Sequence, residues 1–148
     1  MKSVLIINGP NLNMLGHREP EIYGTATLPE IMEGLKAEFP ALNILHFQSN
    51  SEGAIIDRIQ TAADDAACIG IVLNAGAYTH TSLAIADAIA AVAPLPVVEV
   101  HLSNVFAREE IRRHSLIAGV CAGSIAGFGP LSYSLAIRAL ESGAEAGS

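Results

Sequence analysis

Short apolar segments alternate strictly with segments of helical periodicity along the whole chain. One of them, IGIVL at 69–73, is continuously apolar, which is typical of a parallel strand covered on both faces. Further strand candidates occur at 4–8, 43–48, 96–100 and 119–125. Apolar residues at helical spacing predict helices at 28–39 and 55–63. An alanine-rich helix at 81–92, a short charged helix at 107–114 and a closing helix at 131–140 are also expected. Since parallel strands need helical crossovers that cover the sheet, the alternation predicts an α/β protein.

The alternation is interrupted by no repeat, low-complexity stretch or linker. We therefore expect a single domain over 1–142, built as a flavodoxin-like, doubly wound parallel sheet of five strands with helices on both faces. The last residues, 143–148, are expected to form a disordered tail.

The composition is apolar, with 51% hydrophobic residues and a mean hydropathy of +0.41. No apolar run approaches the ~20 residues that a membrane span requires, and the opening segment is too short for a secretory signal. We therefore expect a cytoplasmic protein that hides part of its apolar surface between subunits, as a homo-oligomer. Cys68 and Cys121 stand far apart in apolar stretches, which predicts buried thiols and neither a disulfide nor a metal site.

The charge pattern predicts a small anionic ligand. A net charge of −7 argues against nucleic acid and anionic membranes as partners. The few basic residues are nevertheless uneven, because Arg108, Arg112 and Arg113 share one short segment and Arg18 lies in the glycine-bounded loop at 16–24. Guanidinium groups suit a carboxylate or a phosphate.

Polar segments follow three of the expected strands. They are NGPNLN at 8–13, NAGAYTHTS at 74–82 and HLSN at 101–104. Because ligands of doubly wound folds bind outside the carboxyl ends of the strands, we expect these segments to converge on one site.

Several of these residues also have a purely structural interpretation. Asn11, Asn13 and Asn74 are possible turn formers, and His80 precedes a helix that Thr81 or Ser82 would cap. His101 follows its strand where chains leave a parallel sheet towards a site. Glu99 lies inside that strand and needs a buried partner, whereas Arg113 is expected to be solvated. The dinucleotide fingerprint, the P-loop and the HExxH zinc motif are absent.

With these residues in view, the chain resembles the type II 3-dehydroquinate dehydratases. The likeness covers nearly the whole chain in order and includes the segments VLIINGPNLNMLGHREPEIYG, LNAGAYTHTS and PVVEVHLSNVFAREEIRRHS. It implies loss of water from 3-dehydroquinate to give 3-dehydroshikimate, without a metal, a cofactor or a Schiff-base lysine. Lys2 and Lys36 are the only lysines, and neither lies in an expected site segment.

The resemblance also implies the catalytic roles. Tyr23 matches the base that removes a proton next to the ketone. A free phenol has a pKa of about 10, so Arg18 is expected to lower the pKa of Tyr23 and to close over the substrate with it, in a lid at 16–24. His101 matches the acid that protonates the leaving hydroxyl, with Glu99 orienting it or favouring its charged form. Asn11 matches the residue that positions a water at the enolate oxygen.

The remaining implied contacts concern binding and assembly. Asn74, with the backbone amides of Leu102 and Ser103, matches the cradle for the substrate carboxylate. His80 and Arg112 match contacts to ring hydroxyls, Arg108 matches a lid or wall position, and Asp87 matches a residue that reaches a neighbouring subunit's site. Relatives form trimers that assemble into dodecamers.

Three other classes of function are alternatives for this pattern of residues. A flavodoxin-like module could bind a phosphate through NGPNLN and the arginines without catalysis. A phospho-receiver would need an acidic cluster where Asn8 and Asn74 end their strands. A hydrolase using Ser103 and His101 lacks the glycine pattern of a nucleophile elbow.

Overall fold

The computed structural model describes residues 1–17 and 19–146 and contains a five-stranded parallel sheet. The strand order is β2-β1-β3-β4-β5, with every neighbouring pair parallel. The bounds are β1 (Ser3–Asn8), β2 (Asn43–Gln48), β3 (Cys68–Asn74), β4 (Val97–His101) and β5 (Gly123–Ala126). The predicted doubly wound, flavodoxin-like sheet is thereby confirmed.

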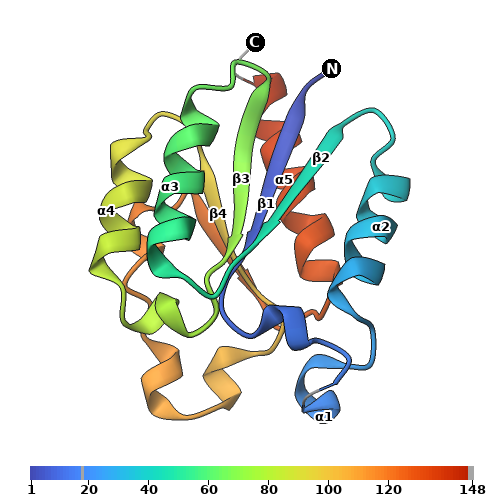
Figure 1. The fold of residues 1–148 in the computed structure, drawn as a ribbon, viewed down its shortest axis with the longest axis vertical. Coiled ribbons are helices and arrows are strands. Elements are labelled where there is room, and N and C mark those ends of the chain that lie inside the picture. Colours follow the sequence, from blue (N-terminus) through green and yellow to red (C-terminus); the bar gives the residue numbers. More distant parts are fainter. Residues whose placement is uncertain (18, 147–148) are drawn as a thin grey trace.

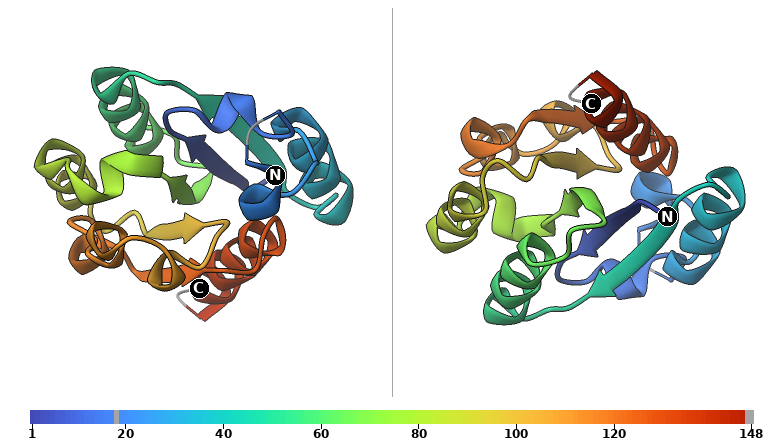
Figure 2. Two further views of the ribbon diagram at one scale, coloured as in Figure 1. Left: turned by 90° about the horizontal axis from the view of Figure 1, so that it is seen from below. Right: turned by 90° about the horizontal axis from the view of Figure 1, so that it is seen from above.

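Two helices cover each face of the sheet (Figure 1). On one face lie α2 (Leu28–Glu38) and α5 (Leu131–Ala146), and on the other α3 (Glu52–Ala63) and α4 (Leu83–Ala91). The views along the strands show the sheet between these two layers (Figure 2). The one-turn helix α1 (Pro20–Tyr23) lies beyond the carboxyl ends of the strands, and the N-terminus and the end of α5 lie at the opposite end.

Alternate residues of each central strand enter opposite halves of the core. In β1, Val4 and Ile6 pack with residues of α2 and α5, whereas Leu5 and Ile7 pack with residues of α3 and α4. All four are at most 1% exposed. The continuously apolar strand sequences follow from this, because a strand covered on both faces buries every side chain.

Hydroxyl caps begin α2, α3 and α4. The side chains of Thr27, Ser51 and Ser82 accept hydrogen bonds from backbone N–H groups in the first turns of α2, α3 and α4. Ser82 is thus the cap of α4, and a short 3₁₀ helix, η2 (Gly76–His80), precedes it.

Between β4 and α5 one predicted helix is wrong, and the predicted fifth strand is present with different bounds. The segment at 107–114 is no α-helix but belongs to two 3₁₀ turns, η3 (Val105–Ala107) and η4 (Glu110–Arg113). Ile111 within this segment and Phe106 just before it are 65% and 63% exposed, so the segment lacks the buried apolar face that would support a longer helix. The strand predicted at 119–125 is shorter, because its pairing with β4 begins only at Gly123, after a further 3₁₀ turn, η5 (Ala118–Val120).

The closing helix is longer than predicted. α5 continues to Ala146, so the disordered tail expected at 143–148 is wrong for 143–146, while 147–148 lie outside the described residues. The added turn is made mainly of alanine and glutamate, which are good helix formers. Cys68 and Cys121 are free thiols as expected, but they are half-buried and not fully buried.

The loops that follow β1 and β3 are in very close contact. The Gly9 N–H donates to the Asn74 carbonyl over 2.7 Å, and a Cβ on Gly9 would lie 2.5 Å from the Ala75 oxygen. Gly76 has φ +61°, and a Cβ there would lie 3.2 Å from the Pro10 oxygen. Glycine is required at both positions for these loops to meet.

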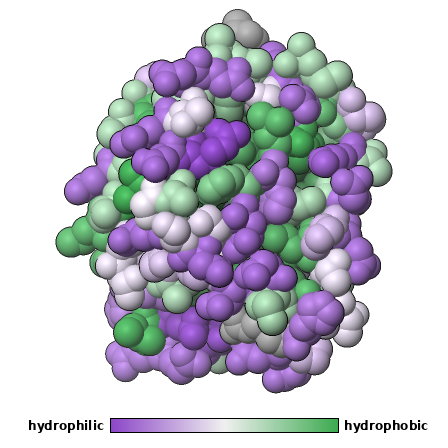
Figure 3. All heavy atoms as spheres, in the orientation of Figure 1, coloured by the Kyte–Doolittle hydropathy of each residue, from purple (hydrophilic) through white to green (hydrophobic). Residues whose placement is uncertain are grey.

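The surface is mainly polar. Hydrophilic residues cover most of the face seen in Figure 3, and hydrophobic residues form separate patches on it. Within residues 1–17 and 19–146, no helix has the length and apolar character needed to cross a membrane.

Candidate active site

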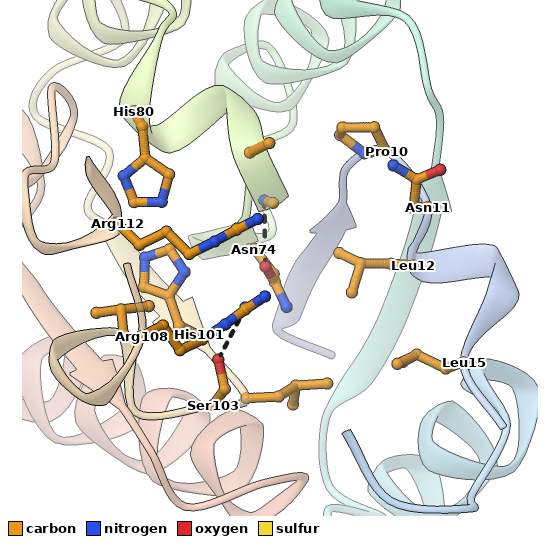
Figure 4. A pocket seen from close by; sticks show the side chains of 14 residues that line it. Pro10, Asn11, Leu12, Leu15, Asn74, His80, His101, Ser103, Arg108 and Arg112 are labelled. Carbon is orange, nitrogen blue, oxygen red and sulfur yellow. Dashed lines mark hydrogen bonds between the residues drawn. The ribbon is translucent and has the colours of Figure 1, made fainter. Parts of the chain in front are cut away.

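A pocket opens at the carboxyl ends of β1, β3 and β4, where the three polar loops converge as expected (Figure 4). Loop residues after β1 form one side of it, and residues that follow β3 and β4 form the other. The lining residues are Pro10, Asn11, Leu12, Leu15, Asn74, Gly76, Ala77, His80, His101, Leu102, Ser103, Val105, Arg108 and Arg112. Eight of the residues expected in a site therefore line one cavity, namely Asn11, Asn74, His80, His101, Leu102, Ser103, Arg108 and Arg112.

A buried carboxylate lies behind the pocket and holds His101. Glu99 is 2% exposed, and its Oε2 accepts a hydrogen bond from His101 Nε2 over 2.9 Å. Two hydroxyls also donate to it, Ser115 to Oε2 over 2.7 Å and Ser124 to Oε1 over 2.5 Å. Glu99 thus has the buried partners that the sequence required.

These donors decide the ionisation of the carboxyl group. Burial raises the pKa of Glu99, but the hydrogen bonds from His101, Ser124 and Ser115 outweigh this effect and leave the pKa below its ordinary value. Since the ionised carboxylate can only accept, His101 Nε2 carries a hydrogen. His101 Nδ1 is therefore the ring nitrogen left for another partner.

His80 is oriented in a similar way by the backbone. Its Nδ1 lies 2.7 Å from the carbonyl oxygen of His114, so Nδ1 is the donor and Nε2 is left for another contact. The His80 and His101 rings are stacked, with centroids 6.3 Å apart and planes inclined by 18°. Both imidazoles thus lie on the same side of the pocket (Figure 4).

Two asparagines complete the centre of the pocket. Asn11 has φ 70°, in the left-handed region, and its backbone N–H donates to Asn50 Oδ1 over 3.0 Å. It is therefore both the turn former and a pocket residue. Asn74 is 3% exposed, and its Oδ1 accepts from the Gly76 N–H over 3.3 Å.

The arginines enter the pocket from the 3₁₀ segment after β4. Arg112 Nε donates to Glu109 Oε2 over 2.7 Å, and Arg108 Nη1 donates to Ser103 Oγ over 3.4 Å. Two guanidinium groups beside the Asn74 amide make this pocket rich in hydrogen-bond donors. Such a pocket suits a small carboxylate or phosphate ligand.

The expected lid lies next to the pocket. Its two bounding glycines, Gly16 and Gly24, have φ +89° and +82°, which L side chains rarely adopt. Glu21, Ile22 and Gly24 line a second cleft, whose other lining residues include three of the first pocket, Leu102, Ser103 and Arg108. Arg18 and the side chain of Tyr23 lie outside the described residues, although the Tyr23 backbone ends α1.

Comparison with known proteins identifies the family of this fold and pocket. Residues 2–141 match the family described as Dehydroquinase class II. The chain belongs to the class II dehydroquinase family. It is 59% identical over 139 residues to a 3-dehydroquinate dehydratase of Nitratiruptor sp., covering 93% of this chain and 87% of that protein. It is 54% identical over 138 residues to the 3-dehydroquinate dehydratase of Pelodictyon phaeoclathratiforme, covering 93% and 91%.

The fold agrees with solved structures of class II dehydroquinases. The crystal structure of the type II dehydroquinase from Butyrivibrio crossotus superimposes with a TM-score of 0.92 at 45% identity, covering 95% of this chain and 97% of that chain. All residues that line the pocket of the present chain lie within 2–141, the range that matches the family.

Two charged residues that the sequence analysis considered lie away from the dehydroquinase pocket. Asp87 is exposed on α4, and Arg113 is exposed on η4, as expected for a solvated residue. Neither lines the pocket of the single chain. Within the described residues, no group of three His, Cys, Asp or Glu could hold a metal ion.

Sequence reasoning missed the residues that support this pocket from behind. They are Ser115 and Ser124 on Glu99, and Asn8 and Tyr133 behind Asn74. Asn8 was noted only as a strand end. Tyr133 has no signal of its own, because a tyrosine at an apolar position of α5 is typical of a helix core.

Proposed function

We propose that the chain catalyses the loss of water from 3-dehydroquinate to give 3-dehydroshikimate. One observation carries this proposal: an imidazole held by a buried carboxylate shares a single pocket with Asn11, Asn74 and two arginines. The chain belongs to the class II dehydroquinase family and is similar to proteins named 3-dehydroquinate dehydratase.

The first step is removal of a proton from the carbon next to the ketone. The phenolate of Tyr23 takes this proton, and Arg18 stabilises the phenolate that would otherwise form only near pH 10. The electron pair moves into the carbonyl, which becomes an enolate. Asn11 positions a water that donates to the enolate oxygen.

The second step is loss of the hydroxyl. The enolate electrons return, the carbon–oxygen bond breaks, and the departing oxygen takes a proton from His101 to leave as water. Because Glu99 occupies Nε2, the proton comes from Nδ1. Exchange with solvent then returns a proton to His101 and removes one from Tyr23.

The polar groups of the pocket bind the substrate during both steps. Asn74 and the backbone amides of Leu102 and Ser103 hold its carboxylate. His80 and Arg112 contact the ring hydroxyls, and Arg108 forms the wall that the lid at 16–24 closes against. The cleft between the lid residues and Arg108 supports this assignment.

A direct assay tests the reaction. Purified protein incubated with 3-dehydroquinate should produce the absorbance of a conjugated enone, and the same protein with His101→Ala should not. If no enone forms while inorganic phosphate binds, the alternative of a phosphate-binding module without catalysis is correct.

We also propose that the enzyme acts as a cytoplasmic homo-oligomer, in trimers that assemble into a dodecamer. Several apolar side chains are exposed on the single chain around α4 and the 3₁₀ turns, namely Leu83, Phe106, Ile111, Leu116 and Val120. Asp87 lies on the exposed side of α4 with Leu83. Burial of this surface against a neighbouring subunit would bring Asp87 to that subunit's pocket.

Mixing two inactive variants tests the shared site. Tyr23→Phe and Asp87→Ala, each nearly inactive alone, are unfolded together in equal amounts and refolded. If each site takes these residues from two chains, random assembly leaves about a quarter of the sites with both native residues, and activity returns. If one chain supplies both, no site is intact and no activity returns.

A further inference from the structure

Four polar side chains form a continuous line behind the pocket, from Asn74 to the far side of β1. Asn74 Nδ2 lies 3.1 Å from Tyr133 Oη, the Tyr133 hydroxyl is hydrogen-bonded to Asn8 Oδ1, and Asn8 Nδ2 lies 3.0 Å from His46 Nε2. Tyr133 and Asn8 are 0% exposed. The tyrosine ring otherwise packs in the apolar core between the sheet and α5.

A backbone group fixes the direction of every hydrogen bond in this line. The Gly76 N–H can only donate, so the atom of Asn74 that faces it is Oδ1 and the atom that faces Tyr133 is Nδ2. The Tyr133 oxygen therefore accepts from Asn74 and donates its hydrogen to Asn8 Oδ1. Asn8 Nδ2 in turn donates to His46 Nε2.

The ionisation of the two ring residues agrees with this direction. Burial, with a smaller effect of the Lys36 charge, lowers the pKa of His46, so its ring is neutral at neutral pH and Nε2 can accept. Burial raises the pKa of Tyr133, and the tyrosine keeps the hydrogen that it donates.

We propose that Tyr133 is a positioning residue that holds the Asn74 amide with one Nδ2 hydrogen directed at the substrate carboxylate. The Asn74 amide is fixed at both ends, by Gly76 at Oδ1 and by Tyr133 at one hydrogen of Nδ2. The second hydrogen of Nδ2 is the one available to the pocket. This assignment rests on the proposed function, because the role of Asn74 at the carboxylate does.

Tyr133→Phe tests the proposal with the least change in volume. Without the tyrosine hydroxyl the Asn74 amide can rotate, which weakens its contact with the substrate carboxylate. That contact is expected to be equally strong in the ground state and the transition state. KM for 3-dehydroquinate should rise about tenfold while kcat stays within about twofold. The matched control is Ser134→Ala, the next residue of α5, which loses a hydroxyl that donates to Glu38 over 2.6 Å and should leave KM unchanged.

A double-mutant cycle separates positioning from general destabilisation. If Tyr133 acts through Asn74, adding Tyr133→Phe to Asn74→Ala should change KM no further. Two effects that multiply would overturn the proposal. Should Tyr133→Phe not fold, Asn8→Ala removes the acceptor of the tyrosine, and the same cycle applies: a rise in KM that vanishes with Asn74→Ala supports the proposal, and an unchanged KM overturns it.

A measurement without substrate keeps this proposal distinct from the proposed function. In the ¹H–¹⁵N spectrum of the free protein, Tyr133→Phe should shift the side-chain amide resonances of Asn74, and Ser134→Ala should not. Unchanged Asn74 resonances overturn the positioning role. Shifted resonances in a protein that does not turn over 3-dehydroquinate would support the positioning role and contradict the function.

Discussion

The two walls of the pocket are held in place very differently. The strand-end wall consists of Asn74 and His101, each fixed by buried partners, one through Tyr133 and Gly76 and the other through Glu99. The loop wall consists of Arg108 and Arg112 after β4, and the proposed lid at 16–24 borders the adjoining cleft. Arg112 is held there by an ion pair with Glu109, whose side chain is 65% exposed.

The difference separates two tasks. Donors and acceptors of the strand-end wall have their directions set before a ligand arrives, which is the preorganisation that stabilises developing charge. Arg112 in the loop wall has an exposed partner, so we expect this wall to rearrange as the ligand enters and leaves. We therefore expect loop-wall changes to alter KM, and strand-end changes at His101 to alter kcat.

Tyr23→Phe should give the largest loss of activity. That loss would show that a residue of the proposed lid takes part in the reaction. Removing the proposed base should lower kcat about 10³-fold, with KM close to normal. Tyr78→Phe is the matched control, since its hydroxyl donates to the Asn50 carbonyl over 2.7 Å and Tyr78 does not line the pocket. A kcat within tenfold of the parent would remove Tyr23 as the base.

Glu99→Gln tests the strand-end wall and should affect turnover more than substrate binding. The amide oxygen can still accept from the His101 Nε2–H, with the amide NH2 turned to the Ser124 hydroxyl, but the site loses the negative charge beside the imidazole. We expect kcat to fall about 100-fold with little change in KM. Ser124→Ala, which removes one of three donors to the carboxylate, should have a smaller effect. Equal effects on kcat and KM would contradict the division between the walls.

Arg112→Lys should affect binding more than turnover. A lysine keeps the charge but loses the planar donor geometry, and KM should rise about tenfold with a small change in kcat. The control is Glu109→Gln, which removes only the exposed partner and should change KM less than twofold. If kcat falls as much as KM rises, the loop wall is preorganised too.

Lowering the pH should gradually reduce the stability that the hydrogen bonds of Glu99 contribute to the fold. The pKa of Glu99 is lowered in the fold, so its contribution to stability is fully present above the unfolded value of about 4.5 and is lost as the pH falls through the folded value. The difference in unfolding free energy between the parent and Glu99→Gln should therefore narrow below about pH 4.5. Urea unfolding at pH 7, 5 and 4 measures it, and a constant difference would mean that Glu99 does not gain its proton there.

The sheet and the place of the pocket could be predicted from local patterns, whereas residues such as Leu102 and Ser103 were expected only from the family resemblance. Continuously apolar strands predict a parallel sheet, and polar residues at three strand ends predict where a ligand binds. The charged segment at 107–114 was wrongly predicted as a helix, because its sequence does not show that Ile111 is 65% exposed.

The supporting residues could not be predicted in the same way. Tyr133 and Asn8 are 125 residues apart in sequence, and Ser124 and Glu99 are 25 apart. Their hydrogen bonds depend on the register of β4 with β5 and on the rotation of α5 about its axis. Neither the strand register nor the helix rotation produces a periodic pattern in the sequence.

The contact between Gly9 and Ala75 has a consequence for inhibitor design. With no room for even a methyl group at Gly9, the loops after β1 and β3 cannot slide past one another, and Asn11 and Asn74 keep a fixed separation. A stiff scaffold can therefore be matched to those two amides with little loss of torsional freedom. Its adjustable substituents belong on the opposite side, where they can follow Arg108 and Arg112.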